Sequence, residues 1–389
     1  MKKLKKIFLI LIIVTNTNIL TGCWNYKETN DMGIVAGVAI DKDKHNNKYI
    51  LTTEIISFTS EGGGNTITSD IYITEGVTPF DSVRDILIQK SEKPYWTHTK
   101  IIIFSKDIAE DDIVSIVDYL YRDAEIRGDI KFLISKEDTA GEILNIKTKK
   151  DNDIISFSIN QAIEFQKSVA KYPVITMWEF ITSLGTDGSS PIVTSIDKEL
   201  LNGKERFRVF GGYAFKGDKL VGWLNSNECK SALWVTNKIK GGLVQVEGVV
   251  NGNKYKNDLE IFKSKTKIKP IIKDNKVALN INVDIDVGIA AINGDINFMQ
   301  KDNMKILQKD GEQYVKKSIE CIINKAQNIF KSDIFGFSDI IQREMPKEWK
   351  KIKPYWSSIF QSLDTNVNVK ININNAALNS EIIKVGESK

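Results

Sequence analysis

Histidine and cysteine are scarce in this chain of 389 residues, which has two histidines and three cysteines. His45 and His98 are too few for a multi-histidine metal site, and no Cys-x-x-Cys pair of the kind that binds zinc occurs. The sequence also lacks the G-x-S-x-G elbow of serine hydrolases and the H-E-x-x-H motif of zinc proteases. We therefore expect no metal site, no cofactor and no enzymatic activity.

Two partial motifs do not change that expectation. The S-x-x-K spacing of penicillin-binding proteins occurs at residues 168–171 and 264–267, but the partner K-T-G is absent, and in an alternating strand Ser264 points away from Lys267. Residues 41–47 (DKDKHNN) begin like a calcium loop, yet Asn46 replaces the sixth-position glycine and Thr52 the twelfth-position glutamate. A solvated hairpin turn is the favoured interpretation of that stretch.

Other candidate residues also have a structural interpretation. His98 precedes an apolar strand, and a hydrogen-bonded structural histidine is favoured there over a site residue. Trp349 and Trp356 are seven residues apart, a spacing that suits an aromatic groove. More often, such residues anchor a terminal segment on the core.

Excess positive charge is confined to the start of the chain. Lys2, Lys3, Lys5 and Lys6 account for the whole formal net charge of +4, because the remaining residues contain equal numbers of acids and bases. Nothing after them supplies the broad positive field that a nucleic-acid-binding protein needs. We expect no nucleic acid among the partners.

Long apolar runs are also missing at the start of the chain. The basic residues are followed by eight unbroken apolar residues, 7–14, which cover about 12 Å as a helix, far less than the roughly 30 Å hydrocarbon core of a bilayer. A secretory signal fits this pattern better than a transmembrane helix. A signal segment of residues 1–22 is therefore predicted.

The signal segment ends in a motif for lipid attachment. Leu20, Thr21, Gly22 and Cys23 match the bacterial lipobox, in which the cysteine thiol receives a diacylglycerol and becomes the new N-terminus. Two or more acyl chains hold a protein stably on a membrane. We predict Cys23 as the lipid attachment site and the outer face of the cytoplasmic membrane as the location; the alternative is a plain signal peptide with an incidental cysteine.

The other two cysteines are Cys229 and Cys321. That compartment permits a disulfide between them, but two cysteines far apart in sequence form no disulfide framework. We expect both to be small buried apolar residues, and the sequence leaves their pairing open.

The periodicity predicts an α+β protein with several mixed α/β domains and largely antiparallel sheets. Residues 23–150 form an N-terminal mixed domain, 151–204 a small middle region, and 205–389 a C-terminal domain with a long helix, 300–331, on a sheet. Thr78 and Thr176 are predicted N-caps. Phe80, Val83 and Leu87 fall on one face of the helix after Thr78, and this face is expected to be buried.

The late part of the chain also shows strand patterns. The strands predicted in this part are residues 207–215, 219–224, 242–250, 259–272, 277–289 and 367–373. Those predicted in the first domain are residues 34–40, 49–58, 66–74, 100–105 and 129–135.

Three ordered blocks of sequence carry a resemblance to a known family. They are residues 22–25 (GCWN) with Glu28, Asn30, Asp31 and 34–41; then 98–104 (HTKIIIF), Ala109, 121–127 (YRDAEIR), Ala140 and 142–144; and finally 214–215, 218–224 (DKLVGWL), 233–234, 332–337 (SDIFGF) and 346–353 (PKEWKKIK). Together they resemble the C subunit of spore germinant receptors, the Ger(x)C lipoproteins. Asn25, Ser338 and Pro354 depart from the family pattern.

The resemblance implies a lipid-anchored protein on the outer surface of the spore's inner membrane, which works with two integral membrane subunits, A and B. It also implies a fold of several mixed α/β domains without enzymatic activity, and it supplies no germinant pocket. The alternative from another class is a solute-binding lipoprotein of a transport system. That alternative predicts two doubly wound lobes around a cleft.

Overall fold

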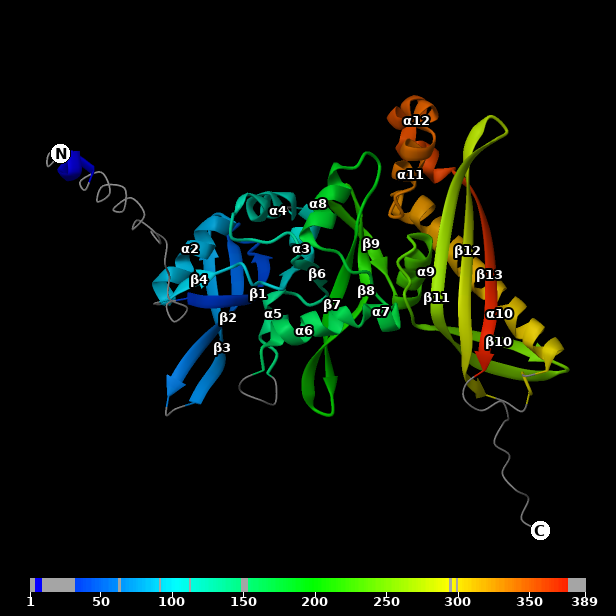
Figure 1. The fold of residues 1–389 in the computed structure, drawn as a ribbon, viewed down its shortest axis with the longest axis horizontal. Helices are drawn as coiled ribbons and strands as arrows, with labels where there is room; N and C mark the ends of the chain where they lie inside the picture. Colours follow the sequence, from blue (N-terminus) through cyan, green and yellow to red (C-terminus); the bar gives the residue numbers. More distant parts are fainter. Residues whose placement is uncertain are drawn as a thin grey trace, which may run out of the picture.

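The computed structural model describes residues 4–8, 32–61, 64–90, 92–111, 113–147, 153–293, 296–298 and 300–376. These residues form two β-sheets, each covered by helices, with the first sheet and the second sheet side by side along the long axis of the molecule (Figure 1).

The first sheet has nine strands in the order β3-β2-β1-β5-β6-β7-β8-β9, with β4 paired beside β1. Its strands are β1 (Met32–Lys42), β2 (Tyr49–Glu61), β3 (Gly64–Gly76), β4 (Lys93–Tyr95), β5 (Ile101–Phe104), β6 (Lys131–Ser135), β7 (Ile192–Leu201), β8 (Lys204–Lys216) and β9 (Lys219–Leu224). At each end of the sheet, three neighbouring strands run antiparallel to one another: β1, β2 and β3 at one end, and β7, β8 and β9 at the other. Between these ends, neighbouring strands among β1, β5, β6 and β7 run parallel. Both predicted hairpins, near residues 34–58 and 207–224, are confirmed.

Helices cover both faces of the first sheet. One face packs on α2 (Pro79–Gln89), α3 (Lys106–Asp111), α4 (Ile113–Arg122) and α8 (Met177–Gly185), and the other on α5 (Gly141–Leu144) and α6 (Ile155–Glu164), which α7 (Gln166–Val169) follows. The predicted caps are present: the Thr78 hydroxyl accepts from the Asp81 amide, and Thr176 forms a capping box with Glu179.

The second sheet has the order β10-β11-β12-β13. Its strands are β10 (Leu243–Val250), β11 (Asn253–Lys273), β12 (Lys276–Asn293) and β13 (Asp364–Ala376), and only the β12–β13 pair is parallel. The long helix α10 (Lys301–Lys325) continues as a π-helical turn, Ala326–Phe330. The predicted long helix on a sheet is confirmed, as is the mixed α/β class with largely antiparallel sheets.

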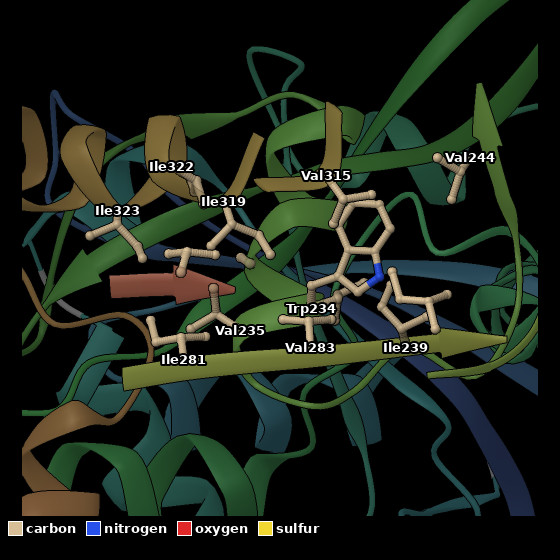
Figure 2. Close-up of a cluster of buried hydrophobic side chains, with 14 of the residues drawn as sticks. Trp234, Val235, Ile239, Val244, Ile281, Val283, Val315, Ile319, Ile322 and Ile323 are labelled. Atoms are coloured by element: carbon tan, nitrogen blue, oxygen red, sulfur yellow. The ribbon is translucent and has the colours of Figure 1, made fainter. Parts of the chain in front are cut away.

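Four shorter helices complete the second part: α9 (Ser226–Val235), α11 (Phe337–Glu344), α12 (Pro346–Ile352) and α13 (Trp356–Gln361), the last two joined by a 3-10 turn, Lys353–Tyr355. Figure 2 shows how α9 fills the space between sheet and long helix, with Trp234 lying between Val283 of β12 and Val315 of α10. One apolar core therefore joins α9, α10 and the second sheet.

The expected buried face of α2 was wrong for two of its three residues, since only Val83 packs against the core. Phe80 and Leu87 are exposed, and Ser82 and Ile86 are buried instead. The reason is a close approach of backbone that periodicity does not show: a Cβ on Gly76 would lie 2.4 Å from the Ser82 nitrogen. The small pair lets the helix approach the sheet on that side, and the larger apolar side chains then point outward.

The domain division at residues 150 and 204 stays a prediction. The second boundary falls at the turn between β7 and β8, which are paired strands of one sheet.

Candidate functional site

The predicted lipid attachment site lies outside the described residues. Leu20, Thr21, Gly22 and Cys23 all precede Met32, where the described body of the protein begins. The lipobox and its cysteine therefore stay predictions. What the structure does describe is the junction between the two sheets, where several segments that carry the family resemblance meet.

Residues 332–337, which we call the junction segment, connect the two parts of the protein. The Ser332 hydroxyl donates to the Phe215 carbonyl at 2.7 Å, and the Ser190 amide donates to the Asp333 carbonyl at 2.9 Å. The Ser190 hydroxyl in turn accepts from the Gly217 amide at 3.0 Å. The segment that follows α10 is thus hydrogen-bonded to β8 and to the residues before β7.

A buried carboxylate organises this segment. Asp333 accepts from the backbone amides of Phe335, Phe337 and Ser338 at 3.2, 3.1 and 2.8 Å. Burial raises the pKa of the Asp333 carboxyl to about 6, while the three amide donors act in the opposite direction. The carboxylate satisfies donors that the start of α11 would otherwise leave unpaired.

Two tryptophans close one side of the junction. Trp349 and Trp356 are both buried and contact each other edge to face, with ring centroids 5.3 Å apart. The Trp356 indole nitrogen donates to the Gly188 carbonyl at 3.3 Å, and Lys353 pairs with Asp187 beside it. The anchoring role favoured from the sequence is confirmed, because these side chains fix α12 and α13 onto the loop after α8.

Two adjoining hollows border the junction. The larger, of about 700 Å³, lies among α8, α9, α11 and β11, and the smaller, of about 440 Å³, lies beside Trp356. Charged side chains in the larger hollow pair with one another, Lys238 with Glu179 and Arg343 with Asp339. These hollows have the volume of a small-molecule site and lie where two parts meet, the usual place for one.

Two further buried carboxylates, which the sequence did not single out as site residues, lie in the first sheet and bind the starts of helices. Asp41 accepts from the amides of Ala140 and Gly141 at 2.6 and 3.0 Å, and its pKa is raised to about 6 by burial. Glu54 accepts from the amides of Ile155 and Ser156, both at 2.8 Å. Each acid from β1 or β2 thus holds the first turn of a helix about 100 residues later. The signal in the sequence is an acid inside an apolar strand.

The turn after β1 is the solvated hairpin that we favoured over a calcium loop. The His45 and Lys48 amides donate to the side chains of Asp43 and Asn46, at 2.8 and 2.9 Å, which is ordinary turn chemistry. Within the described residues, no group of three or more His, Cys, Asp or Glu side chains gathers in a way that would hold a metal ion.

His98 lies at the surface, beside a polar hollow of about 400 Å³. Lys131, on the wall of this hollow, is committed to Glu164 and to the Asn160 amide oxygen. The His98 ring lies tilted at 57° to the Tyr95 ring, with centroids 5.9 Å apart.

The expectation for the cysteines was right for one and wrong for the other. Cys229 is buried in α9, and Cys321 is exposed on α10; both are free thiols. Position 321 lies on the side of α10 away from the stripe formed by Val315, Ile319 and Ile322.

No helix in the part of the chain that the structure describes is long and apolar enough to cross a membrane.

Two protein-family models and several relatives match most of the chain. The model of the family "Spore germination protein N-terminal domain" matches residues 25–198, and that of "Spore germination B3/GerAC like, C-terminal" matches residues 211–376. Spore germination protein KC of Bacillus subtilis is 23% identical over 404 residues, covering 98% of each chain. Spore germination protein B3 of the same organism is 25% identical over 372 residues, covering 92% of this chain and 94% of that one.

A solved structure has the same fold. The crystal structure of the GerBC protein superimposes with a TM-score of 0.54 and 22% identity, covering 87% of this chain and 96% of that one.

Proposed function

The chain belongs to the germinant receptor C-subunit family of spore germination proteins, and from this premise we propose that it is a lipid-anchored, non-enzymatic subunit of a spore germinant receptor. Cys23 carries the lipid, and the folded body contacts A- and B-type integral membrane subunits. The observation that carries the proposal is that the two family models match in order, over residues 25–198 and 211–376.

The lipobox supports the anchoring step. A basic start, a short apolar run, a small pair and a cysteine occur in the order that lipid attachment needs. An anchored protein meets a membrane partner at a far higher effective concentration than a free one does. The anchor therefore contributes to assembly without adding any contact of its own.

The character of the buried acids supports a role without catalysis. Asp41, Glu54 and Asp333 each accept from backbone amides at the start of a helix, so their carboxylates have structural partners. The charged side chains of the larger hollow are likewise paired with one another. Such groups are committed to the fold, and a protein–protein role uses the surface around them.

A solute-binding lipoprotein is the weaker alternative. It predicts two doubly wound lobes, whereas the described strands form one nine-stranded mixed sheet and one four-stranded, mostly antiparallel sheet. The relatives above are spore germination proteins.

The test compares wild type, Cys23→Ala and the matched control Cys321→Ala in sporulating cells. Membrane fractionation reports anchoring, nutrient-triggered germination reports receptor function, and a calcium-dipicolinate trigger controls for spore competence. We expect Cys23→Ala alone to leave the membrane fraction and to lose the nutrient response, while the response to calcium dipicolinate is kept.

Two other outcomes separate the parts of the proposal. A Cys23→Ala protein that stays in the membrane fraction contradicts the lipid anchor. A protein that leaves the membrane while nutrient germination is unchanged supports the anchor and contradicts the receptor role of the anchored form.

A further inference from the structure

Helix α2 carries large apolar side chains on its outer side. Phe80, Leu87 and Ile88 are 46%, 42% and 83% exposed. Phe80 and Leu87 are seven residues apart, so they lie on one line along the helix, and Ile88 lies beside that line. We call these three residues the α2 apolar surface.

Contacts on the inner side hold this surface outward. The Ser82 hydroxyl donates to the Tyr49 carbonyl at 3.2 Å, and Ile86 is completely buried in the core of the first sheet. The Asp81 carboxylate accepts from the Val77 amide at 3.0 Å at the start of the helix. Rotation of α2 to bury Phe80 and Leu87 would break these contacts, so their exposure is built into the fold.

The end of α2 lies where the described chain begins. A Cβ on Gly33, the second residue of β1, would be 2.6 Å from the Cε atom of Lys90, which follows α2 directly. Lys90 is itself fixed, because its ammonium donates to the Ser57 hydroxyl at 2.9 Å and pairs with Glu92 at 3.0 Å. Leu87 and Ile88 are therefore close to the point where residues 23–31 join the body.

Chain length limits how far this point lies from the membrane. Cys23 and Met32 are nine positions apart in the chain, and nine residues fully extended span about 30 Å. If Cys23 is anchored, the part of the body around the start of β1 is held within about 30 Å of the bilayer. The α2 apolar surface belongs to that part.

We propose that the α2 apolar surface docks on the lipid bilayer, with α2 lying in the headgroup region. This inference rests on the proposed lipid anchor at Cys23. Apolar side chains on one side of a helix enter the boundary between headgroups and acyl chains when the helix lies parallel to the membrane.

Arg84 completes the chemistry of this surface. Its guanidinium lies 4.8 Å from the centroid of the Phe80 ring, between the apolar residues of the same side of α2. An arginine in that position places its alkyl stem along apolar surface and its charged group at lipid phosphates. The Phe80 ring also contacts Tyr119 of α4 edge to face, with ring centroids 5.8 Å apart, so the α2 apolar surface adjoins α4 at this end.

The test uses the full-length lipidated protein in vesicles of phosphatidylethanolamine and phosphatidylglycerol. In a Cys321→Ser background, where Cys229 is buried, Ile88→Cys provides a single site for an environment-sensitive fluorophore. The matched control is Leu200→Cys, because Leu200 is 73% exposed near the tip of the β7–β8 hairpin, away from α2 (Figure 1). Lipids with a spin label in the acyl chain quench only a fluorophore that reaches the bilayer.

We expect strong quenching at position 88 and none at position 200. Equal quenching at the two positions, while the protein floats with the vesicles, overturns the docking and leaves the anchor intact. The docking on lipid is also overturned if the fluorophore at position 88 is quenched or shielded from solvent only when the membrane subunits are present. That result would indicate a protein partner for the α2 apolar surface. If the wild-type protein does not float with vesicles, the anchor fails and this inference fails with it.

A pair of substitutions checks the energetics independently. Ile88→Gln in the lipidated protein should speed its transfer between vesicle populations several-fold, because one inserted side chain no longer contributes, and Leu200→Gln should leave the rate unchanged. Circular dichroism verifies that both variants are folded. Unchanged transfer of a folded Ile88→Gln protein contradicts the proposal.

Discussion

Gly188 is the position where a single added methyl group should damage the junction most. It has a positive φ of 80°, and a Cβ there would lie 2.2 Å from Cδ1 and 2.7 Å from Nε1 of Trp356. Trp356 is buried and donates to the Gly188 carbonyl. Gly188→Ala therefore forces either the loop after α8 or the tryptophan to move.

The size of the effect follows from two separate terms. A left-handed backbone conformation costs a residue with a Cβ about 1–2 kcal/mol, and overpacking costs about 1–3 kcal/mol. Gly188→Ala should therefore lower the free energy of unfolding by about 2–5 kcal/mol. Gly203 has a φ of 71° and no atom within 4 Å of its Cβ position. Gly203→Ala therefore has the backbone cost without the clash, and it is the matched control.

Urea unfolding followed by tryptophan fluorescence and by circular dichroism measures both variants. The difference between Gly188→Ala and Gly203→Ala isolates the clash, since the backbone cost is common to both. A difference near zero would refute the argument, because it would mean that Trp356 moves away freely and does not fix the junction.

Three further predictions concern buried groups. The raised pKa of Asp333, about 6 against 3.8 in the unfolded chain, means that the folded protein binds the proton more tightly. Its free energy of unfolding should therefore rise as the pH falls from 7 to 4, by at most about 3 kcal/mol from this group, and Asp333→Ala should remove that share in urea titrations. Glu54→Ala leaves two amides of α6 without their acceptor, so unfolding should need about 1–3 kcal/mol less and hydrogen exchange in that turn should quicken. A maleimide should modify Cys321 in the folded protein and Cys229 only after unfolding, since burial raises the pKa of the Cys229 thiol; equal rates would contradict this.

The features that the sequence predicted correctly are those with local causes. Thr78 and Thr176 cap helices through bonds to residues three positions later. The hairpin of β8 and β9 forms around a two-residue turn in which Gly217 has a positive φ. Alternate residues of β12, among them Ile281, Val283 and Ile285, are buried on one face of the sheet, as the period of two requires. In each case the residues that decide the structure are within a few positions of one another.

The features that the sequence missed depend on contacts between distant segments. Asp41 and Glu54 bind helix starts 99 to 102 residues later, and no local pattern identifies such a partner. The buried side of α2 is decided by the fit of Ser82 against Gly76, a contact between two segments that the periodicity of the helix does not show. The lipobox, which lies outside the described residues, stays a prediction of the sequence.

The junction segment explains how residues without catalytic chemistry can matter to a protein of this kind. Separating the two sheets would break the bonds from Ser332 to Phe215 and from Ser190 to Asp333, and it would expose Trp356. Each buried donor or acceptor left without a partner costs about 1–3 kcal/mol, and the indole adds the free energy of its apolar area. The two sheets are therefore expected to move as one unit, so that a contact made by the α2 side of the first sheet changes the position of the second sheet as well. The proposed role through protein–protein contact relies on this property, which buried packing and hydrogen bonds supply.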